Sequence, residues 1–499
     1  MGSVAELSRL LQGKVLVGAD ITDSEIRNID VFYLSKLIES YFSDRQGLKV
    51  LDKQTLAEII KQATEPKIPK PVAPIKSEAA HAEKQKTYKY ANARIEYSES
   101  SSNSFINYFN NRFEKLKRIM TESRSYGTTD IANLEGFVAG REVSVIGMVY
   151  ERRFTKNGHI LITLEDTTGS VNVLFAKPQE NVRETRPDQR LVFEQAAKIT
   201  KDDVVLVKGK VSKGLLIANY FSWPDIPIRT RKQSKEDFAV AFITDTHVGH
   251  KLFLEKQFNK MLEWLNHRLD YMKELAEKVS YVVITGDLVD GVGVYPGQEK
   301  ELLVSDIYAQ YAMFFELIKQ IPDGIEVFVL PGNHDGVRRA EPQPELDREL
   351  AKYNTGNVHL VTNPAWLELQ DLLVLAYHGA SLDSIISSVR GCSYSRPEEA
   401  MVELLRRRHL SPIYGTNPIV PGKDDDLVID RIPDILAMGH IHKNGAIDYH
   451  GTLVLNGGTW QARTAYQIKQ GHIPTPAILP VYEAKSRNLN VIDFNRLVI

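Results

Sequence analysis

The sequence predicts an α/β domain that follows a small β-barrel and a small N-terminal helical domain. Five apolar runs between residues 237 and 499 each end in a cluster of His, Asp or Asn side chains. Runs of this kind are typical of buried strands. Between residues 130 and 226 lie five shorter runs with strand character, separated by turn signals. Residues 1–64 instead show apolar side chains at helical spacing.

The composition bounds the class of protein. A chain of 499 residues is too long for one hydrophobic core and predicts two to four domains. A hydrophobic content of 43% and a charged content of 25% are typical of soluble globular proteins. The formal net charge of −2 argues against a wholly basic nucleic-acid binder, although a local basic groove is compatible with it. The single cysteine, Cys392, excludes an internal disulfide framework. Because the chain has no run of 18 apolar residues, we expect a cytoplasmic protein without a membrane partner.

The N-terminal third changes character twice. We expect residues 1–64 to form a small helical domain with an adaptor or docking role. Residues 65–102 are rich in Pro, Lys and Ala, which predicts a flexible linker. Residues 103–129 predict a connecting helix, because aromatic residues such as Phe105 and Phe109 recur at helical spacing. These aromatic side chains are expected to pack against the domain that follows.

The five strands expected within residues 130–226 predict a small barrel. The turn at residues 164–173 resembles the turn between strands 2 and 3 of the oligonucleotide-binding (OB) fold. Cations beside an aromatic ring are the mixture with which single-strand binders contact phosphates and bases. Two alternatives remain, because basic hairpins also protect sheet edges and such barrels also dock proteins. The candidate DNA-binding residues are Arg152, Arg153, Phe154 and Lys156.

Five apolar runs in residues 237–499 end in side chains that bind metal ions or transfer protons. The runs are AVAFIT, YVVIT, EVFVLP, LLVLAY and DILAM. Ligands collect outside the carboxyl ends of strands in sheets of this kind, so we expect one shared cavity. The expected metal ligands are Asp245, His247, Asp287, Asn333, His378, His440 and His442.

Seven His, Asp and Asn donors exceed what one tetrahedral ion needs and fit two divalent ions that share a carboxylate. Mixed imidazole and carboxylate donors suit Mn, Fe or Zn better than Ca. We favour Mn, with Fe, Zn or Mg as alternatives. Two such ions clamp a phosphoryl group and activate water for in-line attack. Asp287 is the natural bridge. His334 is expected to act as the general acid, with Asp335 fixing its tautomer.

The order of these clusters resembles the calcineurin-like metallophosphoesterases. The resemblance implies a sandwich of two mixed β-sheets flanked by helices over residues 237–499. It also implies that one ion is held by Asp245, His247, Asp287 and His442. The other ion would then be held by Asp287, Asn333, His378 and His440, and His334 would be the catalytic acid.

The helical domain, linker, barrel and phosphoesterase order resembles the small subunits of archaeal family D DNA polymerases over essentially the whole chain. The segments at residues 378–387, 404–415, 425–444 and 456–461 carry this likeness. It implies a proofreading 3′–5′ exonuclease that acts on single-stranded or mismatched DNA ends. The implied partners are a large catalytic polymerase subunit and the primer 3′ end, with the sliding clamp and primase reached through the complex. A prokaryotic, nucleoid-associated location is implied as well.

Two other interpretations remain open on the sequence. The chain would be a stand-alone phosphodiesterase or phosphatase if the barrel is incidental. It would be a catalytically silent polymerase scaffold if the metal site is not used, although uncompensated buried donors would be costly to retain. The long segment at residues 382–433 contains a basic helix end at residues 406–409. That helix end is expected either to contact a polyanion or partner subunit or to be a solvated helix face.

Overall fold

The chain divides into two compact units, residues 1–71 and 72–499. In the first unit, short helices and two paired parallel strands enclose a small apolar core that includes Leu7, Leu11, Leu51 and Leu56. The helical domain expected at residues 1–64 thus also contains strands. Its elements are α1 (Val4–Leu11), β1 (Leu16–Val17), α2 (Asp23–Ile26), β2 (Val50–Leu51) and α4 (Lys53–Thr64). The structure is a computed structural model that describes residues 3–11, 14–26, 34–35, 38–39, 41–42, 49–64, 86–95, 101–122, 127–178, 187–352, 354 and 356–497.

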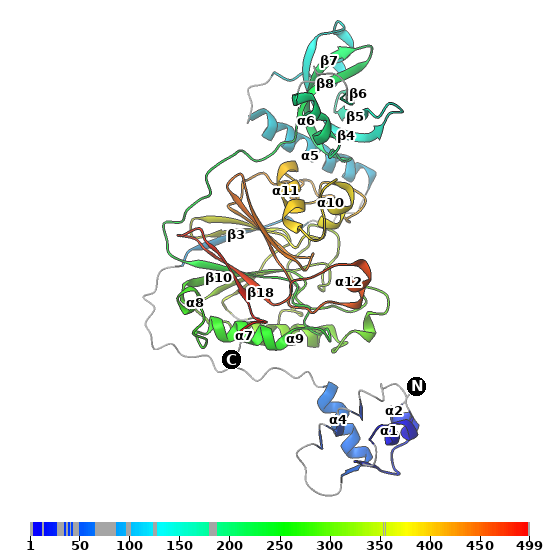
Figure 1. The fold of residues 1–499 in the computed structure, drawn as a ribbon, viewed down its shortest axis with the longest axis vertical. Coiled ribbons are helices and arrows are strands. Elements are labelled where there is room, and N and C mark those ends of the chain that lie inside the picture. The colour runs from blue at the N-terminus through cyan, green and yellow to red at the C-terminus, as the bar shows by residue number, and fades with distance from the viewer. Residues whose placement is uncertain are drawn as a thin grey trace. The chain divides into compact units, whose positions relative to one another are not determined.

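Two six-stranded mixed sheets form the centre of the second unit (Figure 1). The first sheet has the order β12-β11-β10-β9-β18-β19, and the second has the order β16-β17-β15-β14-β13-β3. The strands of the first sheet are β9 (Ala239–Ile243), β10 (Val279–Thr285), β11 (Glu326–Leu330), β12 (Val358–Leu360), β18 (Ile478–Glu483) and β19 (Leu489–Asp493). Those of the second are β3 (Tyr88–Asn92), β13 (Ala365–Leu369), β14 (Leu372–Ala376), β15 (Ile435–Met438), β16 (Asn444–Tyr449) and β17 (Thr452–Gly457).

The central strands are apolar along their whole length because both of their faces are buried. In β9, Ala241 and Ile243 face the core beneath the helices of the first sheet, whereas Val240 and Phe242 face the core between the two sheets. Alternation of side chains across a strand produces this division. The outer face of the second sheet is covered by α10 and α11. The helices are α7 (Glu255–Leu265), α8 (Lys273–Lys278), α9 (Ile307–Ile318), α10 (Leu382–Ser388), α11 (Pro397–Arg407) and α12 (Ala465–Gln470), with the 3₁₀ turn η2 (Gln298–Lys300).

The linker prediction for residues 65–102 is wrong over part of its length. Tyr88–Asn92 form β3, which pairs antiparallel with β13 at the edge of the second sheet. The ring of Tyr88 packs edge-on against Phe328, with ring centroids 5.5 Å apart. Residues 65–85 and 96–100 of the predicted linker lie outside the described residues.

The five-stranded barrel is closed in the order β4-β5-β6-β8-β7. This confirms the five strands predicted between residues 130 and 226, with ends that differ by one or two residues. The helix α6 between β6 and β7 was not predicted. The elements of this region are η1 (Ile131–Gly136), β4 (Glu142–Phe154), β5 (Ile160–Asp166), β6 (Gly169–Phe175), α6 (Pro187–Ala196), β7 (Val204–Ser212) and β8 (Leu215–Ser222).

The connecting helix α5 (Ser102–Glu122) packs its apolar stripe against the barrel. Phe113, Leu116 and Met120 form a cluster with Ile146 and Leu206 of the barrel strands. The expectation that this helix packs against the following domain is therefore confirmed. Because the cluster also includes a residue from the segment at 382–433, one helix joins the barrel to the sandwich.

Most of the basic helix end at residues 406–409 is buried, so both interpretations given for it are wrong. The Arg407 Nε donates to Asp203 of the barrel at 2.8 Å, and Arg407 is 2% exposed. The Arg408 Nη2 donates to the Asp430 carbonyl oxygen at 2.9 Å. Guanidinium groups at this depth need such partners, because an unpaired buried charge is costly.

Asp425 anchors α5 to the segment at 382–433 and is itself fully buried. Its carboxylate accepts hydrogen bonds from Arg112 Nε at 2.7 Å and Tyr108 OH at 2.7 Å. The third contact is with His409 Nε2 at 2.9 Å. Burial raises the pKa of Asp425, but the neighbouring His409 and Arg112 outweigh it and hold the pKa well below its usual range.

Asp425→Ala is expected to lower the free energy of unfolding of this junction by about 3–5 kcal/mol, because Arg112 loses its buried partner. Chemical denaturation of the full chain measures the change. The adjacent Asp424→Ala is the matched control, since Asp424 makes more exposed ion pairs with Arg94 and Lys115. Exposed pairs contribute about 0–1 kcal/mol. Equal losses in the two variants would contradict this account of the junction.

Candidate metal centre

The predicted ligands lie directly after the carboxyl ends of β9, β10, β11, β14 and β15. Five of them have a left-handed backbone, with φ between 47° and 69°. A non-glycine residue rarely adopts this conformation, and it is retained where the surrounding structure imposes it. Gly286 (φ +89°) precedes one of them, and a Cβ there would lie 2.6 Å from His378 Nδ1. The five residues with left-handed backbone are Asp245, His247, Asp287, His440 and His442.

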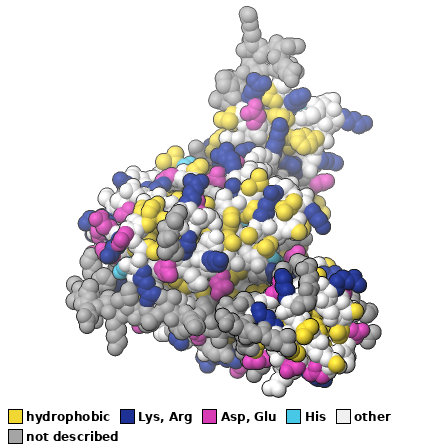
Figure 2. Space-filling model, turned by 60° about the horizontal axis from the view of Figure 1, so that its bottom comes forward, with side chains coloured by type: hydrophobic (Ala, Val, Ile, Leu, Met, Phe, Trp, Pro, Cys, Tyr) yellow, Lys and Arg dark blue, Asp and Glu magenta, His cyan; other side chains and the backbone are white. Residues whose placement is uncertain are grey.

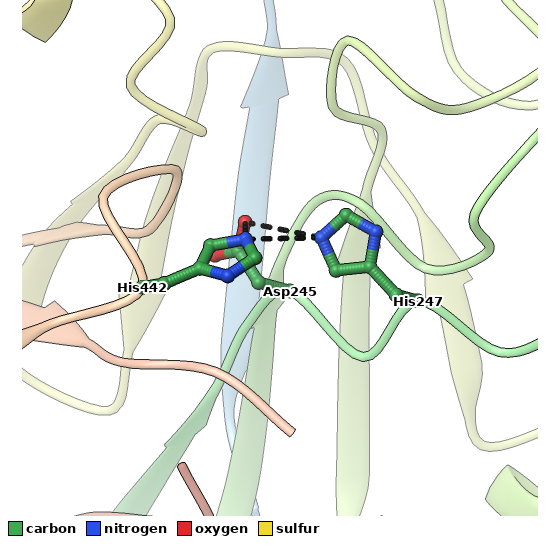
Figure 3. A group of neighbouring side chains, drawn as sticks. All are labelled: Asp245, His247 and His442. Carbon is green, nitrogen blue, oxygen red and sulfur yellow. Dashed lines mark hydrogen bonds and ion pairs between the residues drawn. The ribbon is translucent and has the colours of Figure 1, made fainter. Parts of the chain in front are cut away.

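Asp245, His247 and His442 form the first group of donors (Figure 3). The His442 Nε2 lies 3.3 Å from Asp245 Oδ1 and 3.1 Å from His247 Nε2. The Asp245 Oδ1 is buried and, among the described residues, accepts no hydrogen bond. A buried carboxylate oxygen without a partner is costly, so this group fits a bound cation.

Asp287, His378 and His440 form the second group. The His378 Nε2 lies 3.4 Å from Asp287 Oδ1 and 2.9 Å from Asn333 Oδ1. The other Asp287 oxygen, Oδ2, lies 3.7 Å from His247 Nε2 of the first group. Asp287 therefore faces both groups, as a shared ligand must. The structure thus brings all seven predicted donors together.

The electrostatics of the two groups suit cation binding. Burial raises the pKa of Asp245 and of Asp287, but nearby histidines outweigh it and hold both pKa values below the usual range. Burial lowers the pKa of His247, which favours the neutral imidazole that a metal requires. Burial also lowers the pKa of His440, but Asp383 outweighs it and raises the pKa to about 9.

His334 and Asp335 do not make the contact that was predicted. The His334 Nδ1 lies 2.8 Å from the carbonyl oxygen of Asp290. The Asp335 carboxylate instead accepts hydrogen bonds from Gly332 N at 2.7 Å and from Tyr311 OH at 2.9 Å. Asp335 therefore holds the backbone of the loop, and the Asp290 carbonyl oxygen fixes the orientation of the His334 ring. The prediction failed because sequence proximity does not determine side-chain direction.

Three further residues support the donors and were missed in the sequence. Asp290 Oδ1 lies 3.1 Å from His247 Nδ1, and Asp383 Oδ2 lies 3.0 Å from His440 Nε2. Gln467 Nε2 lies 2.9 Å from His442 Nδ1. Such contacts orient ligating imidazoles. Asp290 had a signal, because it is a further acidic position in the loop after β10. Asp383 and Gln467 lie on α10 and α12, where no local pattern distinguishes them.

A cavity of about 510 Å³ opens onto the two groups. Asp245, His378 and Asp335 lie beneath its surface and are buried. Such a cavity can admit a substrate to the donors, which supports the expectation of a shared pocket. The predicted residues that line the cavity are His247, Asp287, Asn333, His334, His440 and His442.

The candidate DNA-binding residues of the barrel lie at the end of β4 and in the turn after it, away from the residues that line this cavity. The Arg152 guanidinium is half-buried and donates to the Ala197 carbonyl oxygen beyond α6, so it has a structural contact. Arg153 and Lys156 are exposed, and Phe154 is 59% exposed. DNA contact by these residues stays a prediction.

Two features of the described surface limit the class of protein. Among the described residues, no helix combines the length and apolar character needed to cross a membrane. Figure 2 shows Lys and Arg side chains interspersed with Asp and Glu side chains on the visible face, in keeping with a formal net charge of −2.

The fold and the site together define a class. An α/β fold of two mixed sheets, with His and Asp donors at its strand ends, is metallophosphoesterase-like, and a five-stranded barrel precedes it. The model of the B-subunit family of DNA polymerases alpha and epsilon matches residues 240–445. The model of the OB-fold nucleic acid binding domain matches residues 143–216, which confirms the OB fold of the barrel.

Curated relatives identify the family. The chain is 44% identical over 382 residues to the DNA polymerase II small subunit of Archaeoglobus fulgidus, covering 76% of this chain and 74% of the relative. It is 40% identical to that of Methanothermobacter thermautotrophicus, covering 77% and 78%. For the small subunit of Pyrococcus abyssi the identity is 39%, covering 79% and 63%. The chain therefore belongs to the family of DNA polymerase II small subunits, those of the archaeal family D polymerases.

A solved structure of an archaeal phosphodiesterase is 17% identical, with coverage of 51% of this chain and 99% of that chain. Its TM-score of 0.26 marks only a weak likeness.

Proposed function

We propose that this chain provides the 3′–5′ exonuclease of an archaeal family D DNA polymerase and works in complex with the large catalytic subunit. The observation that carries the proposal is the convergence of the seven donors around one cavity, with Asp245 Oδ1 buried and unpartnered among the described residues. A scaffold without catalysis would not need such a set, because buried imidazoles and carboxylates without a cation are costly.

The proposed roles of the residues follow from their contacts. Asp245, His247 and His442 would hold one divalent ion, and Asn333, His378 and His440 would hold the other, with Asp287 shared between them. Two bound ions, for which we propose Mn, would polarise the phosphodiester and lower the pKa of a water molecule. The donor set does not distinguish Mn from Fe or Zn, and Mg would favour more oxygen ligands.

His334 is proposed to donate a proton to the departing 3′ oxygen of the penultimate nucleotide. The Asp290 carbonyl oxygen lies 2.8 Å from Nδ1, so Nδ1 is occupied and Nε2 remains to deliver the proton. His334 lines the cavity, whereas its neighbour Asp335 is buried in the loop beneath. This arrangement fits a general acid, which must reach the leaving group in the transition state.

Selectivity for mismatched ends is proposed to come from the cost of separating the primer end from its template. An unpaired or mismatched nucleotide is cheaper to remove from the duplex than a paired one. The enzyme would then need no contact that reads the sequence.

The proposal is tested with the reconstituted complex of this chain and the large subunit in MnCl₂. Primers labelled at the 5′ end and carrying a matched or a mismatched 3′ nucleotide are compared. We expect stepwise shortening from the 3′ end, faster for the mismatched primer. The absence of any shortening would favour a silent scaffold. Preferential hydrolysis of a phosphopeptide or cyclic nucleotide would favour a stand-alone phosphoesterase.

A further inference from the structure

Four aromatic side chains surround the cavity of the metal centre. Tyr295, Tyr394, Tyr466 and His472 line the same cavity as His334 and His442. They come from three separate segments, namely the loop after β10, the loop before α11, and α12 with the turn that follows it. Tyr466 is 66% exposed and Tyr295 is 36% exposed, although both are large aromatic residues. We refer to these four residues as the aromatic rim.

Two members of the rim are tied to the second group of donors. The rings of Tyr394 and His472 stack with centroids 4.1 Å apart and an interplanar angle of 28°. The Tyr394 OH donates to Asp383 Oδ1 at 3.0 Å. The other oxygen of Asp383 lies 3.0 Å from His440 Nε2. The stacked pair therefore has a fixed position relative to the metal centre.

Tyr295 lies beside the proposed general acid. Its ring centroid is 6.2 Å from that of His334, and its OH donates to Glu301 Oε2 at 2.7 Å. Because the hydroxyl group is held by Glu301, the ring has a defined orientation at the edge of the cavity. Tyr295 is therefore placed where the nucleotide next to the scissile bond would lie.

Tyr466 is positioned by the first turn of α12. Thr464 and Gln467 form a reciprocal capping box, in which each side chain bonds the backbone of the other residue. Gln467 also lies 2.9 Å from His442 Nδ1. The helix thus places Gln467 against a predicted ligand and leaves the Tyr466 ring exposed at the cavity.

The charge of the cavity indicates which part of a nucleic acid the rim can bind. Among the described residues that line it, none is Lys or Arg, whereas Asp290, Glu301 and Asp383 are acidic. These carboxylates repel phosphates, so the protein groups of the cavity cannot grip the DNA backbone. Aromatic rings bind nucleobases instead, by stacking, and accept any base because each has a π-face. Bases inside a duplex are already stacked and unavailable.

We propose that the aromatic rim is a nucleobase-binding subsite that stacks the last unpaired nucleotides of a DNA strand. The inference rests on the proposed exonuclease function and adds a second source of selectivity for frayed ends. It assigns the contact to base faces and predicts no preference among the four bases.

The test is binding of a fluorescent single-stranded oligonucleotide with phosphorothioate 3′ linkages to the full chain in MnCl₂, measured by anisotropy. Tyr466→Ala is expected to raise the Kd about tenfold, equivalent to about 1.4 kcal/mol. Tyr466→Phe keeps the ring and is expected to bind as the wild type does. Tyr308→Ala is the matched control, because Tyr308 is 51% exposed on α9 and does not line the cavity.

An oligonucleotide whose last two nucleotides are abasic distinguishes stacking from other contacts. It is expected to bind the wild type about tenfold more weakly. Tyr466→Ala should weaken it little further, because the base that stacks on the ring is already missing. Equal effects of Tyr466→Ala on abasic and intact strands would overturn the proposal, as would no effect on either.

The same measurements separate this proposal from the exonuclease function. Base-dependent binding without any release of nucleotides from a normal strand would refute the exonuclease and leave the subsite standing. Normal release of nucleotides, with binding that does not depend on the terminal bases, would refute the subsite alone.

Discussion

Asp287→Ala is expected to abolish DNA hydrolysis and to lower the number of divalent ions bound per chain. Asp287 is the carboxylate that faces both donor groups, 3.7 Å from His247 Nε2 and 3.4 Å from His378 Nε2. Without it, each group loses an anionic ligand and the imidazoles are left with less compensating charge. Metal analysis of the purified variant, combined with the nuclease assay in MnCl₂, measures both effects.

The matched control for this variant is Asp290→Ala. Asp290 contacts His247 from behind, with Oδ1 3.1 Å from Nδ1, so its loss misorients one ligand without removing any. Changes of this kind cost about 10–100-fold in metal affinity or activity. Asp287→Ala should therefore be the more severe variant. If it retained metal uptake and hydrolysis at the level of Asp290→Ala, Asp287 would not be the shared ligand.

His334→Ala is expected to slow hydrolysis by about 10²–10⁴-fold, the contribution of a general acid, while metal uptake and folding persist. His334 is not needed for either donor group, and its Nδ1 contact is with a backbone oxygen that remains in the variant. Single-turnover cleavage of a single-stranded oligonucleotide measures the loss, and circular dichroism and metal analysis check that the site is intact.

A substrate with a sulfur leaving group tests the chemical role of His334 directly. A 3′-phosphorothiolate linkage releases a thiolate, which needs no protonation to depart. We expect the His334→Ala variant to cleave this linkage at a rate near that of the wild type. If the variant were equally slow on both linkages, His334 would act in binding or positioning and not as the acid.

Much of the site could be predicted because each donor follows an uninterrupted apolar run. A strand buried on both faces needs such a run, and Val240 and Phe242 face one core while Ala241 and Ile243 face the other. Parallel strands deliver their carboxyl ends to one edge. The positions of the donors thus depend on local sequence, and the pattern was sufficient to locate them.

Features that depend on tertiary contacts were not predictable in the same way. The strand Tyr88–Asn92 lies in a polar segment and exists because it pairs with β13. Arg407 has the sequence context of a solvated helix end, yet it is buried against Asp203, more than 200 residues away in the chain. Asp383 and Gln467 support His440 and His442 from other segments of the chain. Context outweighs local propensity at such positions.

The most direct test of the account is anomalous diffraction from crystals of the full chain grown with MnCl₂. We predict two peaks, one on each side of Asp287, with the first beside Asp245, His247 and His442. The second should lie beside Asn333, His378 and His440. Two-metal sites of this type hold their ions roughly 3.5–4 Å apart. A single peak, peaks elsewhere in the molecule, or none at all would contradict the claim that the seven donors form one dinuclear centre.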